Sequence, residues 1–202
     1  SPPGQSGRDR RHDTDAGRPW QSRQGAGPRA AAYRDDQQHS QRDHADAVGQ
    51  GQRQHAVVGG QPGVHLGIDP EFAMQPGIAP GKKIGTFDAK DINVAIDYLA
   101  ELVKKNNLPP NMLVIHRFTQ GMVTNYKDIR IVPEVQVIMD MDGWGDKVLK
   151  RSTWLRYIYR EPVQYAGFKI FYKNDTKKDK NALYQPEELV KFTPKPLYIQ
   201  YQ

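Results

Sequence analysis

The chain has 202 residues, a formal net charge of +6 and no cysteine, so disulfides and cysteine-based zinc or redox sites are excluded. No apolar run reaches the roughly 18 to 20 residues that span a bilayer, and the first residues lack the charged-then-apolar order of a signal peptide. We therefore expect no transmembrane segment and no signal peptide within this chain.

Residues 1–62 differ in composition from the rest of the chain. They contain no Ile, Leu, Met or Phe and only three Val, while 9 Arg and 7 Asp nearly cancel in charge. Because few apolar side chains are there to offset a backbone ordering cost of roughly 1 to 2 kcal/mol per residue, we expect this segment to be disordered. Its composition is typical of a GC-rich message read out of frame, which would leave it without an evolved function. Binding to nucleic acid is disfavoured, because no dense basic block is present and only Trp20 and Tyr33 could stack on bases.

Residues 63–202 have the composition of a globular domain. Residues 88–107 carry apolar side chains at three- and four-residue steps, with Asp at the start and Lys at the end, which predicts a helix with one buried face. Short apolar runs rich in branched or aromatic residues predict buried strands at 64–68, 112–115, 135–139, 167–172 and 197–201. Weaker helical patterns follow the later strands at 121–130, 146–159 and 186–191.

This alternation of strands and helices predicts an α/β fold with a parallel sheet of about five strands. Five strands are too few to close an eight-stranded barrel. The sequence therefore divides into a disordered segment, 1–62, and one folded domain, 63–202.

Polar residues follow each of the five predicted strands, and ligands of parallel α/β folds bind at the carboxyl ends of strands. This coincidence at all five strand ends predicts a shared polar pocket. In chain order the residues are Asp69 and Glu71, His116 and Arg117, Asp140 and Asp142, Tyr172 and Asp175, and Gln200 and Gln202.

The first acidic pair, Asp69 and Glu71, shares one face of the chain, because alternate residues of a strand point the same way. Two carboxylates so placed repel each other unless a sugar, a metal or a basic side chain lies between them. The alternative is a strand-to-loop turn in which Pro70 fixes the backbone and Asp69 accepts a backbone N–H. His116 is either a ligand-facing residue or a hydrogen-bonded core histidine.

Several later residues also allow two interpretations. Asp140 lies between two methionines, where a charged group needs a partner. Asp142 precedes a glycine and is either part of the pocket or part of an ordinary turn. Lys169 interrupts an apolar run and either faces a carboxylate or points outward from an edge strand. Trp144 either stacks on a sugar or packs under a loop.

Five segments together resemble a group of secreted or lipid-anchored bacterial proteins of uncharacterised activity, which is similar to (β/α)8 barrels of glycoside-hydrolase type. The segments are HLGIDPEFAM (65–74), LVIHRF (113–118), VQVIMDMDGWG (135–145), GFKIFY (167–172) and YIQYQ (198–202). The resemblance implies a partial (β/α)8 barrel, strands four to eight, and a secreted or cell-envelope location. Residues 1–62 stand where the earlier strands of such a barrel would be. This chain also has Arg117 where that group often has Gln, which would alter the charge of the pocket.

The resemblance and the polar pocket together favour a carbohydrate-active hydrolase fold acting on, or binding, carbohydrate such as a cell-envelope glycan. Such a reaction needs two carboxyl groups and no cofactor: Glu71 is the candidate acid, and Asp140 or Asp142 the nucleophile or base. The candidate substrate-binding residues are Asp69, His116, Arg117, Trp144, Lys169, Tyr172 and Gln200.

Two alternatives remain from the sequence. A metal-dependent hydrolase would use Asp69, Glu71, His116 and Asp140 as ligands that activate water. A binding protein would keep the shape of the barrel but have no turnover, and we expect weak or no catalysis from this chain by itself.

Overall fold

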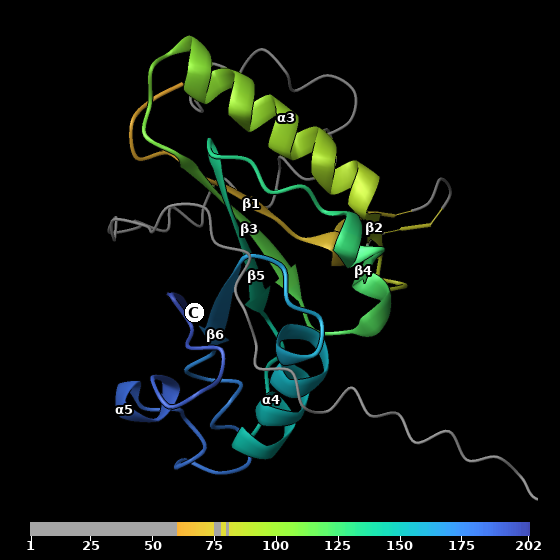
Figure 1. Ribbon diagram of the computed structural model, residues 1–202. Helices are drawn as coiled ribbons and strands as arrows, with labels where there is room; N and C mark the ends of the chain where they lie inside the picture. Colours follow the sequence, from red (N-terminus) through yellow and green to blue (C-terminus); the bar gives the residue numbers. More distant parts are fainter. Residues whose placement is uncertain (1–59, 75–77, 80) are drawn as a thin grey trace, which may run out of the picture.

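The computed structural model describes residues 60–74, 78–79 and 81–202 (Figure 1). The disorder expected for residues 1–62 therefore concerns, apart from its last three residues, a part of the chain outside these ranges.

The largest feature of the structure is an all-parallel sheet of five strands, curled like half of a barrel (Figure 1). Its strand order follows the order along the chain, which is the arrangement that successive crossovers of one hand produce. The predicted parallel sheet is thus confirmed, whereas the described residues do not form a closed barrel. The strands are β1 (Leu66–Ile68), β3 (Asn111–Arg117), β5 (Val135–Met141), β6 (Tyr165–Ile170) and β7 (Tyr198–Tyr201).

Helix α3 (Ala89–Lys105) confirms the helix predicted at 88–107 and connects β1 to β3. The Asp88 carboxylate accepts a hydrogen bond from the backbone N–H of Lys90 in the first turn, and the Asp91 carboxylate accepts one from the backbone N–H of Asp88. This reciprocal pair satisfies amides that the helix leaves unpaired at its start. The buried side of α3, which includes Ile96 and Leu99, packs on the sheet.

The last two predicted helical segments are present, and the second of them is shorter than predicted. Helix α4 (Lys147–Trp154) continues into a π-helical turn, η5 (Leu155–Tyr159), and together they match the predicted 146–159 segment. Helix α5 (Pro186–Leu189) is a single turn that begins at a proline, before β7.

The prediction of a helix at 121–130 is wrong. The structure has 3-10 turns there, η3 (Gln120–Met122) and η4 (Tyr126–Asp128), separated by the short strand β4 (Val123–Thr124). Strand β4 pairs with β2 (Phe87–Asp88), and the Asp88 carboxylate accepts hydrogen bonds from Thr124 Oγ1 at 2.8 Å and Asn125 Nδ2 at 2.7 Å. Asn125 has a left-handed backbone, φ 54°, which a helix does not allow. The described chain therefore does not alternate one helix with every strand.

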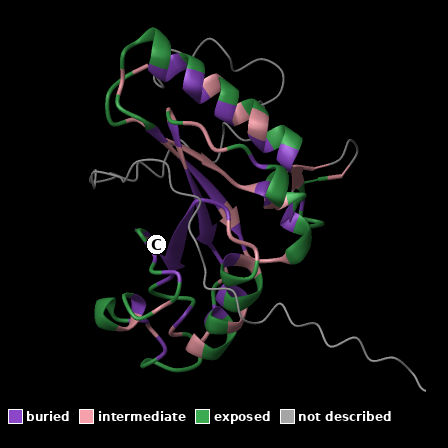
Figure 2. Ribbon diagram, viewed as in Figure 1, coloured by how far each residue is buried: buried purple, intermediate pink, exposed green. Residues whose placement is uncertain are grey.

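The two faces of the sheet differ in chemistry. The face under the helices is apolar and includes Ile115, Met139 and Phe168, which are all buried. The central strands are accordingly coloured as buried in Figure 2. Residues paired across parallel strands point to the same face, so the register that aligns His116 with Asp140 brings these two side chains together on the opposite face. That face has an apolar floor of Val114, Ile138, Tyr165 and Tyr198 and a polar layer nearer the carboxyl ends of the strands.

We expect Leu99→Asp to unfold the domain. Leu99 is 3% exposed on the buried side of α3, and an unpaired charge there should cost more than about 4 kcal/mol. The matched control is Val94→Asp on the same helix, where the side chain is 69% exposed. Thermal unfolding followed by circular dichroism should show loss of the transition in the first variant only; a wild-type transition in Leu99→Asp would contradict the packing.

Candidate functional site

The polar layer centres on His116 at the end of β3. Its Nδ1 lies 3.1 Å from Asp140 Oδ2 and 3.5 Å from Asp142 Oδ2. Burial lowers the pKa of His116, but the hydrogen bond and charge of Asp140 and the charge of Asp142 outweigh burial and nearby Lys169, and the net pKa is raised. The site therefore favours an imidazolium between two carboxylates.

Asp140 is fully buried, and His116 is its ion-pair partner among the described residues. The neighbouring strand makes room for it with Gly167: a Cβ at that position would lie 2.5 Å from Asp140 Oδ1. The Asp140 carboxylate is therefore enclosed by the protein, and it forms its ion pair with His116 inside this enclosure.

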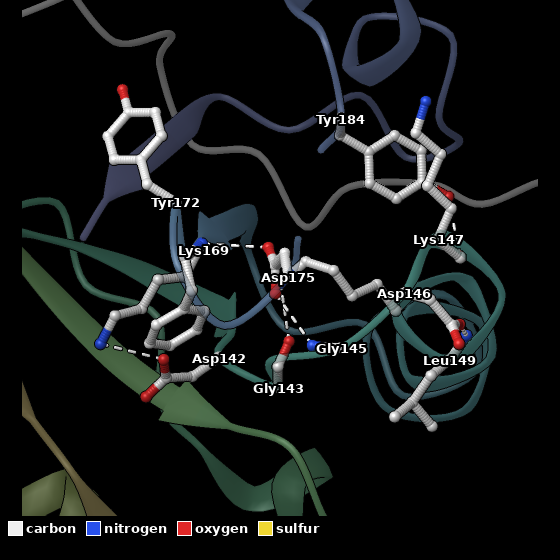
Figure 3. A network of polar contacts seen from close by, with 12 residues as sticks. Asp142, Gly143, Gly145, Asp146, Lys147, Leu149, Lys169, Tyr172, Asp175 and Tyr184 are labelled. Atoms are coloured by element: carbon white, nitrogen blue, oxygen red, sulfur yellow. Dashed lines mark hydrogen bonds and ion pairs between the residues drawn. The ribbon is translucent and has the colours of Figure 1, made fainter. Parts of the chain in front are cut away.

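Asp142 lies just beyond β5 and is 7% exposed. Its Oδ1 lies 2.9 Å from Lys169 Nζ, which reaches across from β6 (Figure 3). Burial raises the pKa of Asp142, while the positive charges of His116 and Lys169 act in the opposite direction. Lys169 thus faces a carboxylate and does not point outward from an edge strand, which was the alternative interpretation of the sequence.

Glu71 lies in the turn η2 (Pro70–Phe72) that follows β1, and it remains partly exposed. Its pKa is raised, first by burial and then by the negative charges of Asp69 and Asp142; Lys169 and His116 lower it. Glu71 therefore lies within electrostatic range of the polar layer and is its most accessible carboxyl group.

The Asp69 side chain accepts a hydrogen bond from the Glu71 backbone N–H at 3.3 Å and caps this turn. Asp69 therefore forms the strand-to-loop turn that was the alternative interpretation of the sequence. Its carboxylate also places a negative charge beside Glu71.

Arg117 lies on the opposite face of β3 from His116 and is fully buried. Its guanidinium lies 2.6 Å from Glu161, donates to the carbonyl oxygens of Gln120 and Val123, and stacks over the ring of Tyr157. The structure thus places Arg117 in a link between the β3 end and the segment after α4, not among the residues around His116.

The other predicted residues are Gln200, Trp144 and Tyr172, which carry no charge. Gln200 pairs with Lys169 in the sheet register and is buried. Trp144 and Tyr172 are 56% and 53% exposed, and Tyr172 stacks on Tyr201 with ring centroids 5.7 Å apart.

A second buried ion pair, which the sequence reasoning missed, braces the loop after β5. Lys150 Nζ lies 3.0 Å from Asp175 Oδ2 and donates to the carbonyl oxygen of Gly143 at 2.7 Å. The Asp175 carboxylate also accepts hydrogen bonds from the backbone N–H groups of Gly145, at 2.8 Å, and Phe171, at 3.0 Å (Figure 3). The pair ties the loop that follows Asp142 to the end of β6.

A sequence signal for Lys150 existed. It lies on the same helical side as Trp154 and Ile158, and a lysine there needs a buried partner. Gly145, with φ 143°, adopts a backbone that side chains disfavour, which allows its amide to reach Asp175.

No group of three or more His, Asp or Glu side chains in the described part of the chain is placed to hold a metal ion. Likewise, none of the helices described here has the length and apolar character needed to cross a membrane.

Comparisons of the chain with models of protein families, with curated proteins and with solved structures found no match. The site must therefore be interpreted from its own chemistry.

We expect Asp140→Asn to lower the pKa of His116, because the substitution removes the charge that most opposes burial. A raised histidine pKa stabilises the fold below the unfolded value of 6.5, and this stability is lost as the pH rises through the folded value. The variant should therefore lose less stability than the wild type between pH 6.5 and the folded pKa. Imidazole titration by NMR measures the shift, with His65, whose pKa is lowered by burial, as an internal reference. An unchanged His116 pKa would show that the pair is not formed.

We expect Gly167→Ala to destabilise the domain by about 1 to 3 kcal/mol, because the added methyl group collides with Asp140 in a packed site. Gly121→Ala is the control, since nothing lies within 4 Å of a Cβ there. Urea unfolding compares the two; equal midpoints would show that Asp140 does not lie against β6 as described.

Proposed function

We propose that the polar layer at the carboxyl ends of β3, β5 and β6 is a carbohydrate site in which Glu71 and Asp142 are the working carboxyl groups. The observation that carries the proposal is the cluster around Asp142: its carboxylate lies 2.9 Å from Lys169 Nζ and 3.5 Å from His116 Nδ1, and its negative charge helps to raise the pKa of Glu71. Glycoside hydrolysis uses such a pair, one carboxyl group as proton donor and the other as nucleophile or base.

Glu71 is the proposed acid. It is the more accessible of the two, and a raised pKa keeps a carboxyl group protonated closer to neutral pH. Asp142 is the proposed nucleophile or base, because His116 and Lys169 both favour its charged form.

The remaining residues support these two. Asp140 positions His116 from behind, and His116 and Lys169 orient both Asp142 and the hydroxyl groups of a bound sugar. Trp144 and Tyr172 expose aromatic faces on which a sugar ring can pack.

This proposal agrees with the resemblance to barrels of glycoside-hydrolase type, and a cell-envelope glycan in a secreted or envelope-bound setting is the substrate class that the resemblance suggests. A metal-dependent hydrolase fits the residues less well, because the candidate ligands His116 and Asp140 already neutralise each other and Asp69 caps a turn.

Binding without turnover is the second candidate function. It is favoured by the short contact between Asp142 and Lys169, which neutralises the carboxylate that hydrolysis would need to be free.

The test of the paired carboxyl groups does not depend on turnover. In Asp142→Asn the pKa of Glu71 should fall, because a negative charge that raises it is removed. Carboxyl titration by NMR measures this change. The control is Asp97→Asn on exposed α3, which should leave the pKa of Glu71 unchanged. If the pKa of Glu71 is the same in Asp142→Asn as in the wild type, the two carboxyl groups do not interact and the proposed site is refuted.

A second experiment tests whether the protein hydrolyses glycans. Glu71→Gln should retain sugar binding, measured by calorimetry with envelope-glycan fragments, and should abolish any hydrolysis, since an amide cannot donate the proton. Glu101→Gln, on the exposed side of α3, is the matched control. Sugar binding by the wild type with no hydrolysis would support the binding function, and an absence of sugar binding would overturn both.

A further inference from the structure

The outer side of α4 and η5 carries large apolar side chains that are each at least 36% exposed. Val148 is 79% exposed, Leu155 41% and Tyr159 36%. Steps of seven and four residues place side chains of one helical segment on a common side. Leu149, 54% exposed, widens the apolar surface at its amino-terminal end. We call the surface formed by these four residues the apolar stripe.

Three arginines lie on the same helical segment as the apolar stripe. Arg151, Arg156 and Arg160 are all exposed, and none of them has an acidic partner within the described part of the chain. No acidic residue occurs between Asp146 and Glu161. The segment therefore combines exposed apolar side chains with arginines that form no ion pair among the residues that the structure describes.

The inner side of the same segment is firmly attached to the domain. Trp154 is 1% exposed, its ring packs against Phe168 and Phe192, and its Nε1 donates to the carbonyl oxygen of Thr193 at 3.1 Å. Lys150 is held by its buried pair with Asp175. These contacts attach the segment to the domain through its inner side, and the turns of α4 that are coloured green in Figure 2 are exposed.

We propose that α4 and η5 dock this protein onto an anionic lipid bilayer, lying in the plane of the interface. Apolar side chains enter the boundary between headgroups and acyl chains, while arginines, with their flexible stems, reach the phosphate groups. Tyr159 suits this depth, since its ring is apolar and its hydroxyl polar. An acidic protein surface would satisfy the arginines but would leave Val148 and Leu155 in contact with polar groups.

The magnitudes favour weak, reversible docking. Each arginine near an anionic membrane contributes about 1 kcal/mol, so three together correspond to roughly a 100-fold change in the partition coefficient. Salt screens this attraction over a distance of about 10 Å at 0.1 M ionic strength, so docking should weaken as salt is added.

The test is flotation of the full chain with phosphatidylcholine vesicles, with and without phosphatidylglycerol. The wild type should float with vesicles that contain phosphatidylglycerol and should not float with those that lack it. Replacing Arg151, Arg156 and Arg160 by Gln should lower the partition coefficient roughly 100-fold. The matched control replaces Lys177, Lys178 and Lys180 by Gln, an equal loss of charge on the exposed loop after β6. All six positions are exposed, so the variants should keep the wild-type thermal transition.

A second measurement tests the apolar stripe itself. Because the chain has no cysteine, Val148→Cys labelled with an environment-sensitive fluorophore reports on one position. Its emission should shift to the blue with anionic vesicles, whereas labelled Lys178→Cys should not shift.

Three results would overturn the proposal: no binding of the wild type to anionic vesicles, an equal loss in the two triple variants, or no shift at position 148. An equal loss would mean that net charge alone attracts the protein.

Discussion

The alignment of β3, β5 and β6 is the constraint on which the site depends. It brings His116, Asp140 and Gly167 side by side, so that a fully buried carboxylate meets an imidazole and a space left by a missing side chain. A buried carboxylate without a partner costs several kcal/mol, and removing its partner can cost about 3 to 5 kcal/mol. Because side chains alternate between faces, a slip of one residue would bury Asp140 among the apolar side chains under the helices. The ion pair and the register therefore enforce each other.

The buried charges of the site form two connected groups with different roles. His116, Asp140, Asp142 and Lys169 create the polar layer itself. Lys150 and Asp175 hold the loop that leaves Asp142 and so fix where its carboxylate can point. Support of this kind suits the proposed function, in which the carboxyl groups would be presented in one geometry.

Helix α4 connects the proposed site with the proposed membrane surface. Its inner side supplies Lys150 to the loop beside Asp142, and its outer side carries Val148 and Leu155. A protein docked through this outer side would hold the polar layer at a set distance from the bilayer, which suits a substrate attached to the cell envelope. The two proposals remain separable, because the vesicle variants alter no residue of the polar layer.

The sequence by itself determined the elements whose signals are local. Helix α3 follows from apolar spacing and the acidic start that caps it, and the five strands follow from short apolar runs. The polar strand ends also predicted that these residues would gather at one edge, because parallel strands direct their carboxyl ends to one edge of the sheet, and His116, Asp140, Asp142 and Lys169 do lie together there. The segment 121–130 was mispredicted as a helix, since Thr124 and Asn125 bond instead to Asp88, a residue 36 or more positions away.

Only the tertiary structure decided which polar residues act together. The sequence predicts that both His116 and Arg117 lie in the pocket. In the structure they point to opposite faces of β3, His116 toward Asp140 and Arg117 toward Glu161, and only the folded sheet shows which face carries the polar layer. The sequence also could not assign Asp69 to a cap or pair Lys150 with Asp175, 25 residues later. Each of these outcomes depends on distances between atoms far apart in the chain, and burial then decides the charge each group carries. Local sequence patterns contain neither quantity.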